Sequence, residues 1–120
     1  MLVEQIEWID EEAKEAIVTL KNEGQTIKCF SCPCVVKLNS EIDNILECLD
    51  TKNVLISESD SQIIKKEKIF EYEIHGKLIN RSEGFVNVFG MIIHIDEIQI
   101  PGDIVENMNI CFSTSRIDIW

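Results

Sequence analysis

The chain has 120 residues, of which 45% are hydrophobic and 28% are charged. This length is typical of one domain, and the composition is too apolar for a disordered segment, so we expect a single domain over residues 1–120. The 22 acidic and 11 basic residues give a formal net charge of −11. Such a negative field repels phosphate backbones, which disfavours nucleic acid as a partner.

The amino-terminal residues have neither the basic start nor the apolar stretch of a signal peptide, because Glu4 and Glu7 interrupt them. No apolar run approaches the ~18 residues needed to cross a bilayer. We therefore expect a cytoplasmic protein with no membrane association. Its five cysteines should stay reduced there, and their odd number excludes complete intramolecular pairing.

Short strands separated by turns are predicted for the first half of the chain. The strands are an edge strand at 6–9, a second at 16–20 and a returning strand at 26–30. Gly24 provides the turn of the hairpin that joins the last two. The corner before them carries Asp10, Glu11 and Glu12, and a short helix over residues 11–16 is the competing prediction there.

The clearest alternation lies in the second half, over residues 70–78. Apolar residues or glycine alternate with charged residues or histidine there, which predicts a half-buried strand. A turn at 80–84 and a β-branched, aromatic run at 85–95 predict a long hairpin, in which Gly90 marks a bulge or bend. Pro101 and Gly102 predict a tight turn into the last strand.

The two halves resemble each other at a constant offset. Residues 45–49 align with 108–112, and residues 54–56 align with 117–119. This pattern indicates two degenerate copies of a three-stranded unit, over 13–57 and 72–120. Two such units bury their apolar faces by packing together, which favours an all-β fold, a small OB-like six-stranded barrel or sandwich.

Cys29, Cys32 and Cys34 form the one local pattern with metal-ligand spacing. A second cysteine pair or a histidine pair is missing, so we predict no metal and no cofactor. In a regular strand Cys29 and Cys32 would point to opposite faces. Cys48 and Cys111 occupy equivalent apolar positions in the two proposed repeats and are expected to be small core residues.

The two histidines are expected on the polar sides of their strands. A hairpin folded about Ser82 places His75 opposite Phe89 and His94 opposite Phe70, which separates the histidines by roughly 17 Å at the rise of a strand. At that separation they cannot bind one ion together. Both are therefore predicted to be exposed surface residues.

No catalytic motif is present, neither a nucleophile elbow nor a phosphate-binding glycine loop nor a zinc-protease helix. We therefore assign no catalytic residue and predict no enzymatic activity. Acidic residues gather at two predicted corners: Asp10, Glu11, Glu12, Asp96 and Glu97. Solvation and turn formation account for such residues, and they are also the candidate partner-binding residues of an acidic protein.

The leading hypothesis is a non-enzymatic binding module, an acidic β domain that recognises a protein partner, in particular a basic one. Immunity proteins and other inhibitors of basic toxins are one biological setting for such a module. One alternative is an OB-like barrel that binds an oligonucleotide or a small ligand. Another is a small metal-binding protein that uses Cys29, Cys32 and Cys34. Exposed strand edges are also compatible with a homodimer.

Overall fold

The computed structural model describes residues 1–119, and almost all of its regular structure is β-strand. The strands of the first half are β1 (Leu2–Asp10), β2 (Glu15–Asn22), β3 (Gln25–Ser31), β4 (Leu46–Leu49), β5 (Lys52–Ile56) and β6 (Gln62–Lys65). Those of the second half are β7 (Tyr72–Asn80), β8 (Phe85–Val88), β9 (Met91–His94), β10 (Asn109–Thr114) and β11 (Arg116–Ile119). Within the described residues the one helix is a short 3-10 turn, η1 (Glu97–Gln99). The predicted all-β class is confirmed.

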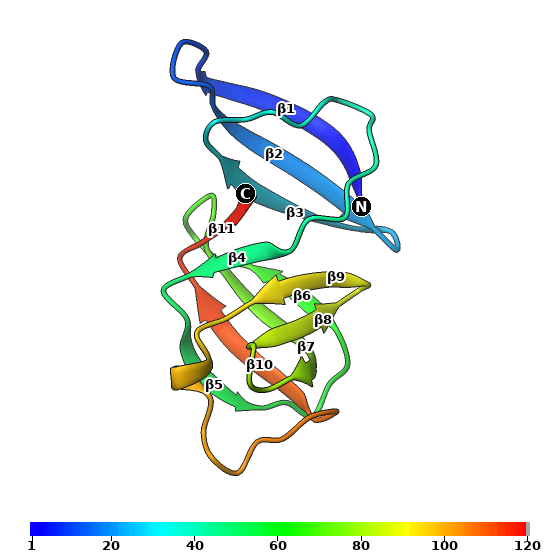
Figure 1. Cartoon of the computed structure of the whole chain (residues 1–120), viewed down its shortest axis with the longest axis vertical. Helices are drawn as coiled ribbons and strands as arrows, with labels where there is room; N and C mark the ends of the chain where they lie inside the picture. The colour runs from blue at the N-terminus through cyan, green and yellow to red at the C-terminus, as the bar shows by residue number, and fades with distance from the viewer. Residues whose placement is uncertain (120) are drawn as a thin grey trace.

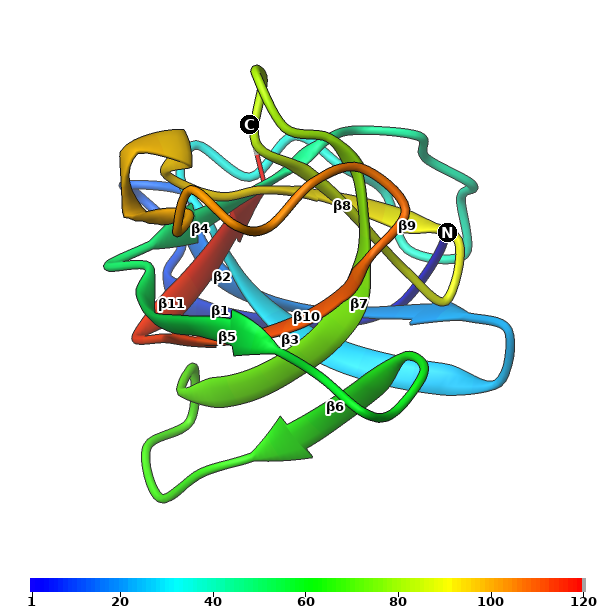
Figure 2. The ribbon, with the colours of Figure 1, turned by 90° about the horizontal axis from the view of Figure 1, so that it is seen from below.

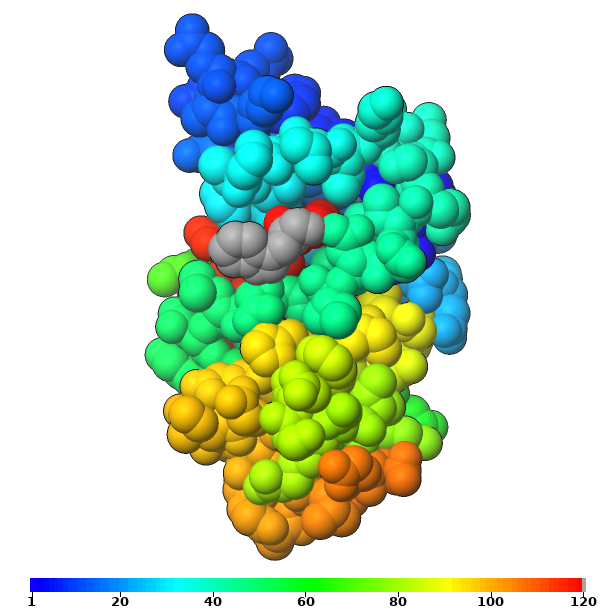
Figure 3. Space-filling model, in the orientation of Figure 1, coloured from blue at the N-terminus to red at the C-terminus, as the bar shows by residue number. Residues whose placement is uncertain are grey.

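All eleven strands belong to one mixed sheet, ordered β1-β2-β3-β11-β4-β9-β8-β7-β10-β5, with β6 attached to β7 outside that path. Most neighbours are antiparallel, but β3 with β11 and β4 with β9 are parallel. The molecule measures 45 × 26 × 25 Å, and the β1–β2 hairpin forms one end of it (Figure 1, Figure 3). The structure thus has eleven strands in place of the six expected. Its two end strands do not pair, so the sheet is not closed into a barrel.

Strands β2 and β3 cover the predicted segments 16–20 and 26–30. In β2 and β3 the side chains of Val18, Leu20, Ile27 and Cys29 are fully or almost fully buried in the core. The turn between the strands has positive φ at Glu23 (48°) and Gly24 (78°), as the two central residues of a type I′ hairpin turn require. The predicted edge strand lies within β1, and the predicted turn is confirmed.

The corner after β1 is a turn and not a helix. Residues 11–14 are in turn conformation and β2 begins at Glu15. Lys14 has a positive φ of 57°, which an α-helix does not allow. The competing prediction of a helix over residues 11–16 is therefore wrong.

Strand β7 shows the predicted period of two. Tyr72, Ile74, Gly76 and Leu78 are buried, while the residues between them are half-buried or exposed. The strand begins two residues later than expected, because Phe70 lies in the turn before it. The half-buried strand that the sequence predicts is present.

The predicted return strand over residues 85–95 is divided in two. Phe89 and Gly90 have positive φ values of 50° and 82°, so the chain reverses there, and β8 and β9 pair as a second hairpin. His94 consequently lies opposite Phe85 and not opposite Phe70. Gly90 marks a reversal of the chain where a bulge or bend was expected.

Two long bent segments, β4–β5 and β10–β11, pair antiparallel with each other. Leu46 lies opposite Ile119 at one end of this ribbon and Ile56 opposite Ile110 at the other. Between the two ladders the Ser115 amide donates to the Leu49 carbonyl at 3.2 Å. These are the segments that align in the sequence. The hairpins beside them are arranged differently, since β3 runs parallel to β11 and β7 antiparallel to β10.

A cleft separates β6 from the edge of β3. Figure 2 shows the sheet curling round, with β6 outside the curl beside β7. The Tyr72 hydroxyl crosses from β7 and accepts a hydrogen bond from the Lys28 amide of β3 at 2.9 Å. Residues of both β3 and β6 line the space between them, so the curl stays open along this line.

Gly76 lies where β7 passes from its contact with β6 to its contact with β8. A Cβ at this position would lie 2.6 Å from the Asn87 carbonyl oxygen and 2.7–2.8 Å from the Val88 and Val86 side chains. We predict that Gly76→Ala lowers the free energy of unfolding by about 1–3 kcal/mol, the usual cost of overpacking. Urea denaturation measures it.

Gly102→Ala is the matched control, because nothing lies within 4 Å of a Cβ there. It should change stability by no more than about 0.5 kcal/mol. Equal effects of the two substitutions would contradict the close packing at Gly76.

Candidate functional site

The acidic corner Asp10, Glu11 and Glu12 lies at the tip of the β1–β2 hairpin, at one end of the molecule (Figure 3). The Asp10 carboxylate accepts hydrogen bonds from the Glu12 amide at 3.0 Å and the Ala13 amide at 3.3 Å. Asp10 therefore holds the turn. Glu11 and Glu12 are exposed, and their carboxylates are free to meet a partner.

The second acidic corner lies in the other half of the molecule, at the start of η1 (Figure 1). The Asp96 carboxylate accepts from the Ile98 amide at 3.1 Å, and the Asp96 amide donates to Thr51 Oγ1 at 3.1 Å. Glu97 is exposed in the first turn. The structure does not bring Asp96 and Glu97 together with Asp10, Glu11 and Glu12, so they do not form one site.

The outer edge of β1 is open over most of its length. Residues 39–42 cover only its first part, where the Val3 amide donates to the Ser40 carbonyl and the Asn39 amide donates to the Val3 carbonyl. In residues 1–119 no strand pairs with the outer side of β1 from Gln5 onward. Backbone donors and acceptors at such an edge are a template for another strand.

The open part of β1 combines apolar and acidic side chains. Trp8 and Ile9 are 46% and 51% exposed. Glu7 and Asp10 lie in the same open part, and Glu4 immediately precedes it. Two register irregularities interrupt the pairing of β1 with β2. Aromatic anchors within a charged surround are typical of protein-binding surfaces.

The other end of the sheet, β5, is a second open edge. Leu55 and Ile56 are exposed there, beside a hollow of about 470 Å³ that Pro101 and Ile104 also line. Asp103 is the one charged residue lining this hollow. The β5 edge therefore exposes apolar side chains beside one lysine, Lys52. Its few charges do not indicate a class of partner, whereas the carboxylates of β1 do.

The cysteines of the Cys29, Cys32, Cys34 pattern are in different environments. Cys29 and Cys34 are buried, and Cys32 is exposed with its thiol 3.6 Å from the Ala13 carbonyl. Burial raises the pKa of the Cys29 thiol far above its ordinary value, so this thiol stays protonated. In the described part of the chain no three His, Cys, Asp or Glu side chains are grouped to hold a metal ion.

Cys48 and Cys111 were both expected in the core, and the structure confirms this for Cys48 only. Cys48 is buried, whereas Cys111 is only half-buried, opposite His75 on β7 and Leu55 on β5. Burial is the main cause that raises the pKa of both thiols. Neither is therefore activated as a nucleophile.

Each histidine is hydrogen-bonded to a glutamate and half-buried, so the prediction of exposed histidines is wrong. His94 Nδ1 lies 2.7 Å from a Glu47 carboxylate oxygen, and His75 Nε2 lies 2.8 Å from a Glu73 carboxylate oxygen. The side chains of His75 and His94 are 13% and 31% exposed. Pairing with β4 and β6 covers parts of the strands that sequence reasoning had left open to solvent.

His75 also connects β7 to the segment after β5. Its Nδ1 lies 2.6 Å from Ser57 Oγ and 3.2 Å from Ser59 Oγ. Serine, histidine and glutamate in hydrogen-bond contact share the connectivity of a nucleophile, base and acid. The Ser57 hydroxyl also accepts from the Ser59 amide at 3.1 Å, and these bonds together hold the segment after β5 against β7. Sequence reasoning missed it, although Glu73 and His75 share one face of an alternating strand.

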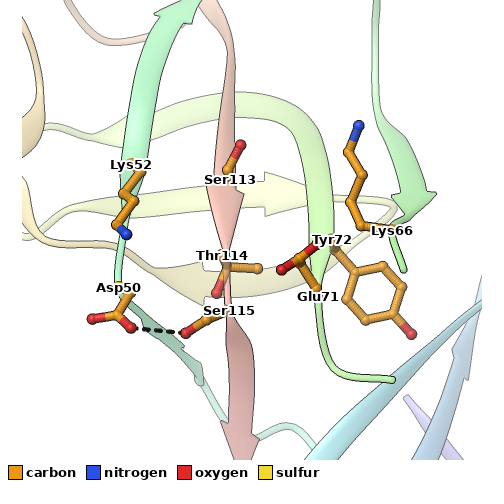
Figure 4. A pocket seen from close by; sticks show the side chains of 8 residues that line it. All are labelled: Asp50, Lys52, Lys66, Glu71, Tyr72, Ser113, Thr114 and Ser115. Atoms are coloured by element: carbon orange, nitrogen blue, oxygen red, sulfur yellow. Dashed lines mark hydrogen bonds between the residues drawn. The ribbon is translucent and has the colours of Figure 1, made fainter. Parts of the chain in front are cut away.

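A small hollow lies between β5, β10 and β7 (Figure 4). Ser115 donates a hydrogen bond to the Asp50 carboxylate at 3.0 Å, the dashed line in Figure 4. The four charged residues lining the hollow carry two charges of each sign: Asp50, Lys52, Lys66 and Glu71. The balanced charges and the volume of about 190 Å³ give it no preference for an ionic ligand.

Comparisons with protein-family models, with curated proteins and with solved structures found no match. Within residues 1–119 no helix has the length and apolar character needed to cross a membrane. The structure alone therefore identifies the candidate site. It is the open, acidic edge of β1 with its exposed apolar side chains.

A hydrogen bond with His75 lowers the pKa of Glu73, partly opposed by desolvation and supported by the Lys66 ammonium. A carboxyl with a lower pKa in the folded state stabilises the fold above its unfolded value of 4.5, and that contribution disappears as pH falls through the folded value. We predict that wild type is more stable than Glu73→Gln near neutral pH and that the difference shrinks below pH 4.5.

Urea midpoints of both proteins across this pH range measure the effect. Taking the difference between the two removes the contribution of the other carboxyls. A difference that stays constant down to acid unfolding would show that Glu73 titrates normally.

Proposed function

We propose that this protein is a binding module that recognises a basic protein by adding a strand of that partner to the open edge of β1. The observation that carries the proposal is the unpaired edge from Gln5 to Asp10, which bears exposed Trp8 and Ile9 among carboxylates. Strand addition supplies main-chain hydrogen bonds, and the side chains along the edge supply specificity.

Charge determines which strand this edge accepts. An antiparallel pair of β1 strands centred on Glu7 would place the carboxylates of Glu4, Glu7 and Asp10 opposite carboxylates of the other copy, and opposed like charges are destabilising. A partner strand rich in lysine or arginine would instead place positive charges opposite these carboxylates. The net charge of −11 also accelerates the approach of a basic protein. The partner is therefore a basic protein and not a second copy paired through β1. An inhibitor of a basic toxin is one function that fits.

Two finer features of the fold belong to the same proposal. The antiparallel ribbon of β4–β5 with β10–β11 supports an internal duplication over residues 13–57 and 72–120. The curl of the sheet supports an OB-like barrel as its ancestor. In this interpretation the barrel is open along one seam, the cleft between β3 and β6. In this interpretation β1 lies outside the duplicated unit and is available for binding.

Affinity capture from a native extract of the source organism, followed by titration of the recovered partner, tests the function. We predict that wild type retains a basic protein in stoichiometric amount and that Glu11→Gln with Glu12→Gln weakens its binding. Two lost surface ion pairs contribute about 0.4–2 kcal/mol, which is about a twofold to thirtyfold rise in Kd. Asp10 is left intact because it holds the turn.

The control carries the same charge change elsewhere: Glu58→Gln with Glu67→Gln, both exposed. Trp8→Ala should weaken binding by about tenfold or more if this side chain anchors the partner. No basic partner, or equal effects of the tip and control variants, would rule out the β1 edge as the binding surface.

A further inference from the structure

The cleft between β3 and β6 collects hydrogen-bond donors from three parts of the sheet. It measures about 320 Å³ and is lined by Thr19, Thr26 and Lys28 on one side, by Ile63 and Lys65 on the other, and by Tyr72. Both flanking backbones are strand edges that do not pair with each other. The space is large enough for a small organic molecule.

Thr19 has a buried hydroxyl with no partner. The residue is 8% exposed, and its Oγ1 is the one buried side-chain polar atom without a hydrogen bond among the described residues. An unsatisfied buried hydroxyl is destabilising and is rare in native structures. Its position in the lining of the cleft indicates that a ligand supplies the missing partner, after the small side-chain movement usual on binding.

Tyr72 offers a second free donor. Its hydroxyl oxygen accepts from the Lys28 amide at 2.9 Å, which leaves the hydroxyl proton without an acceptor in residues 1–119. Burial raises the pKa of Tyr72, so the proton is retained at neutral pH. The hydroxyl can therefore donate into the cleft.

The charge of the cleft is opposite to that of the whole protein. Two lysines line it, Lys28 and Lys65, and no carboxylate is among its lining residues in the described chain. The nearest ion pair joins the Lys28 ammonium to Glu7 at 3.9 Å, between half-exposed side chains, and such pairs are weak. The hollow of Figure 4, by contrast, is balanced in charge.

We propose that this cleft binds the phosphate group of a small phosphomonoester. A phosphate has three strong acceptor oxygens and a charge near −2, which match two ammonium groups and two free hydroxyl donors. A carboxylate has one charge and two oxygens, and would leave part of this set unused. The apolar side chain of Ile63 and the Tyr72 ring line the space for the organic part of the ligand.

The net charge of −11 does not prevent such binding. At physiological ionic strength the Debye length is about 8 Å, so distant carboxylates are screened while the two lysines act at contact distance. The same net charge keeps long phosphate backbones away, which restricts the site to small ligands.

Nuclear magnetic resonance titration with phenyl phosphate tests the site, with benzoate and inorganic phosphate as comparisons. We expect amide shifts at Thr19, Thr26, Lys28 and Lys65, with phenyl phosphate binding more tightly than benzoate. Shifts elsewhere on the surface, no shifts, or equal affinity for benzoate would each overturn the proposal.

Thr19→Val separates this function from a structural role. Removing an unpaired buried hydroxyl should leave the protein at least as stable as wild type, while the Kd for phenyl phosphate rises about tenfold. Thr19→Ser retains the hydroxyl and should retain binding. Unchanged affinity in Thr19→Val would show that the hydroxyl does not contact the ligand and would overturn this site.

The lysines have a matched control. Lys28→Gln with Lys65→Gln should raise the Kd by about tenfold or more, because hydrogen bonds to charged groups are the stronger ones. Lys37→Gln with Lys77→Gln makes the same charge change at exposed positions outside the cleft and should leave binding unchanged. Equal losses in the two pairs would show that only net charge matters, which contradicts a built site.

Discussion

The antiparallel ladder between the β4–β5 and β10–β11 segments is the constraint on which the rest of the fold depends. Every other part of the sheet attaches to this ribbon: β3 joins through β11, β9 through β4 and β7 through β10. Where both segments bend, Thr114 Oγ1 donates to the Leu49 carbonyl at 2.9 Å, and the Ser115 amide donates to the same oxygen. These bonds keep one register through the bend, so both hairpin systems can pack on one core.

A sheet that extends to both sides of a central ribbon has unpaired edge strands unless its outer strands pair with each other. Here the approach of β3 and β6 stops short of pairing, and the groups between them explain why. The Tyr72 hydroxyl takes the Lys28 amide that a neighbouring strand would use, and Lys28 and Lys65 both line the intervening space. Closing the seam would bring these two ammonium groups closer together, and the exposed pair of Lys28 with Glu7 offsets that repulsion only weakly. The open seam thus results from the side chains that line it.

The sequence predicted the local structure better than the connections. Alternation over residues 70–78 located the buried side of β7, and Gly24 located the first hairpin turn, because both signals depend on neighbouring residues. The reversal at Phe89 and Gly90 was missed because a continuous β-branched run hid it, and that error misplaced His94. The pairing of β4 with β11 was also beyond the sequence pattern, since it joins residues far apart in the chain. For the candidate sites, the acidic tip could be predicted from composition. The cleft with Thr19, Lys28 and Lys65 could not, because only the tertiary fold brings those residues together.

Glu7 links the two proposed surfaces and determines the sign of any coupling between them. Its carboxylate lies on β1 and pairs with the Lys28 ammonium at 3.9 Å, while Lys28 lines the cleft. A basic strand on the β1 edge would compete with Lys28 for Glu7 and leave the lysine free for a phosphate. A phosphate in the cleft would likewise release Glu7 toward the edge. Because binding free energies are linked reciprocally, each ligand would favour the other, by no more than the modest strength of one exposed ion pair, about 0–1 kcal/mol.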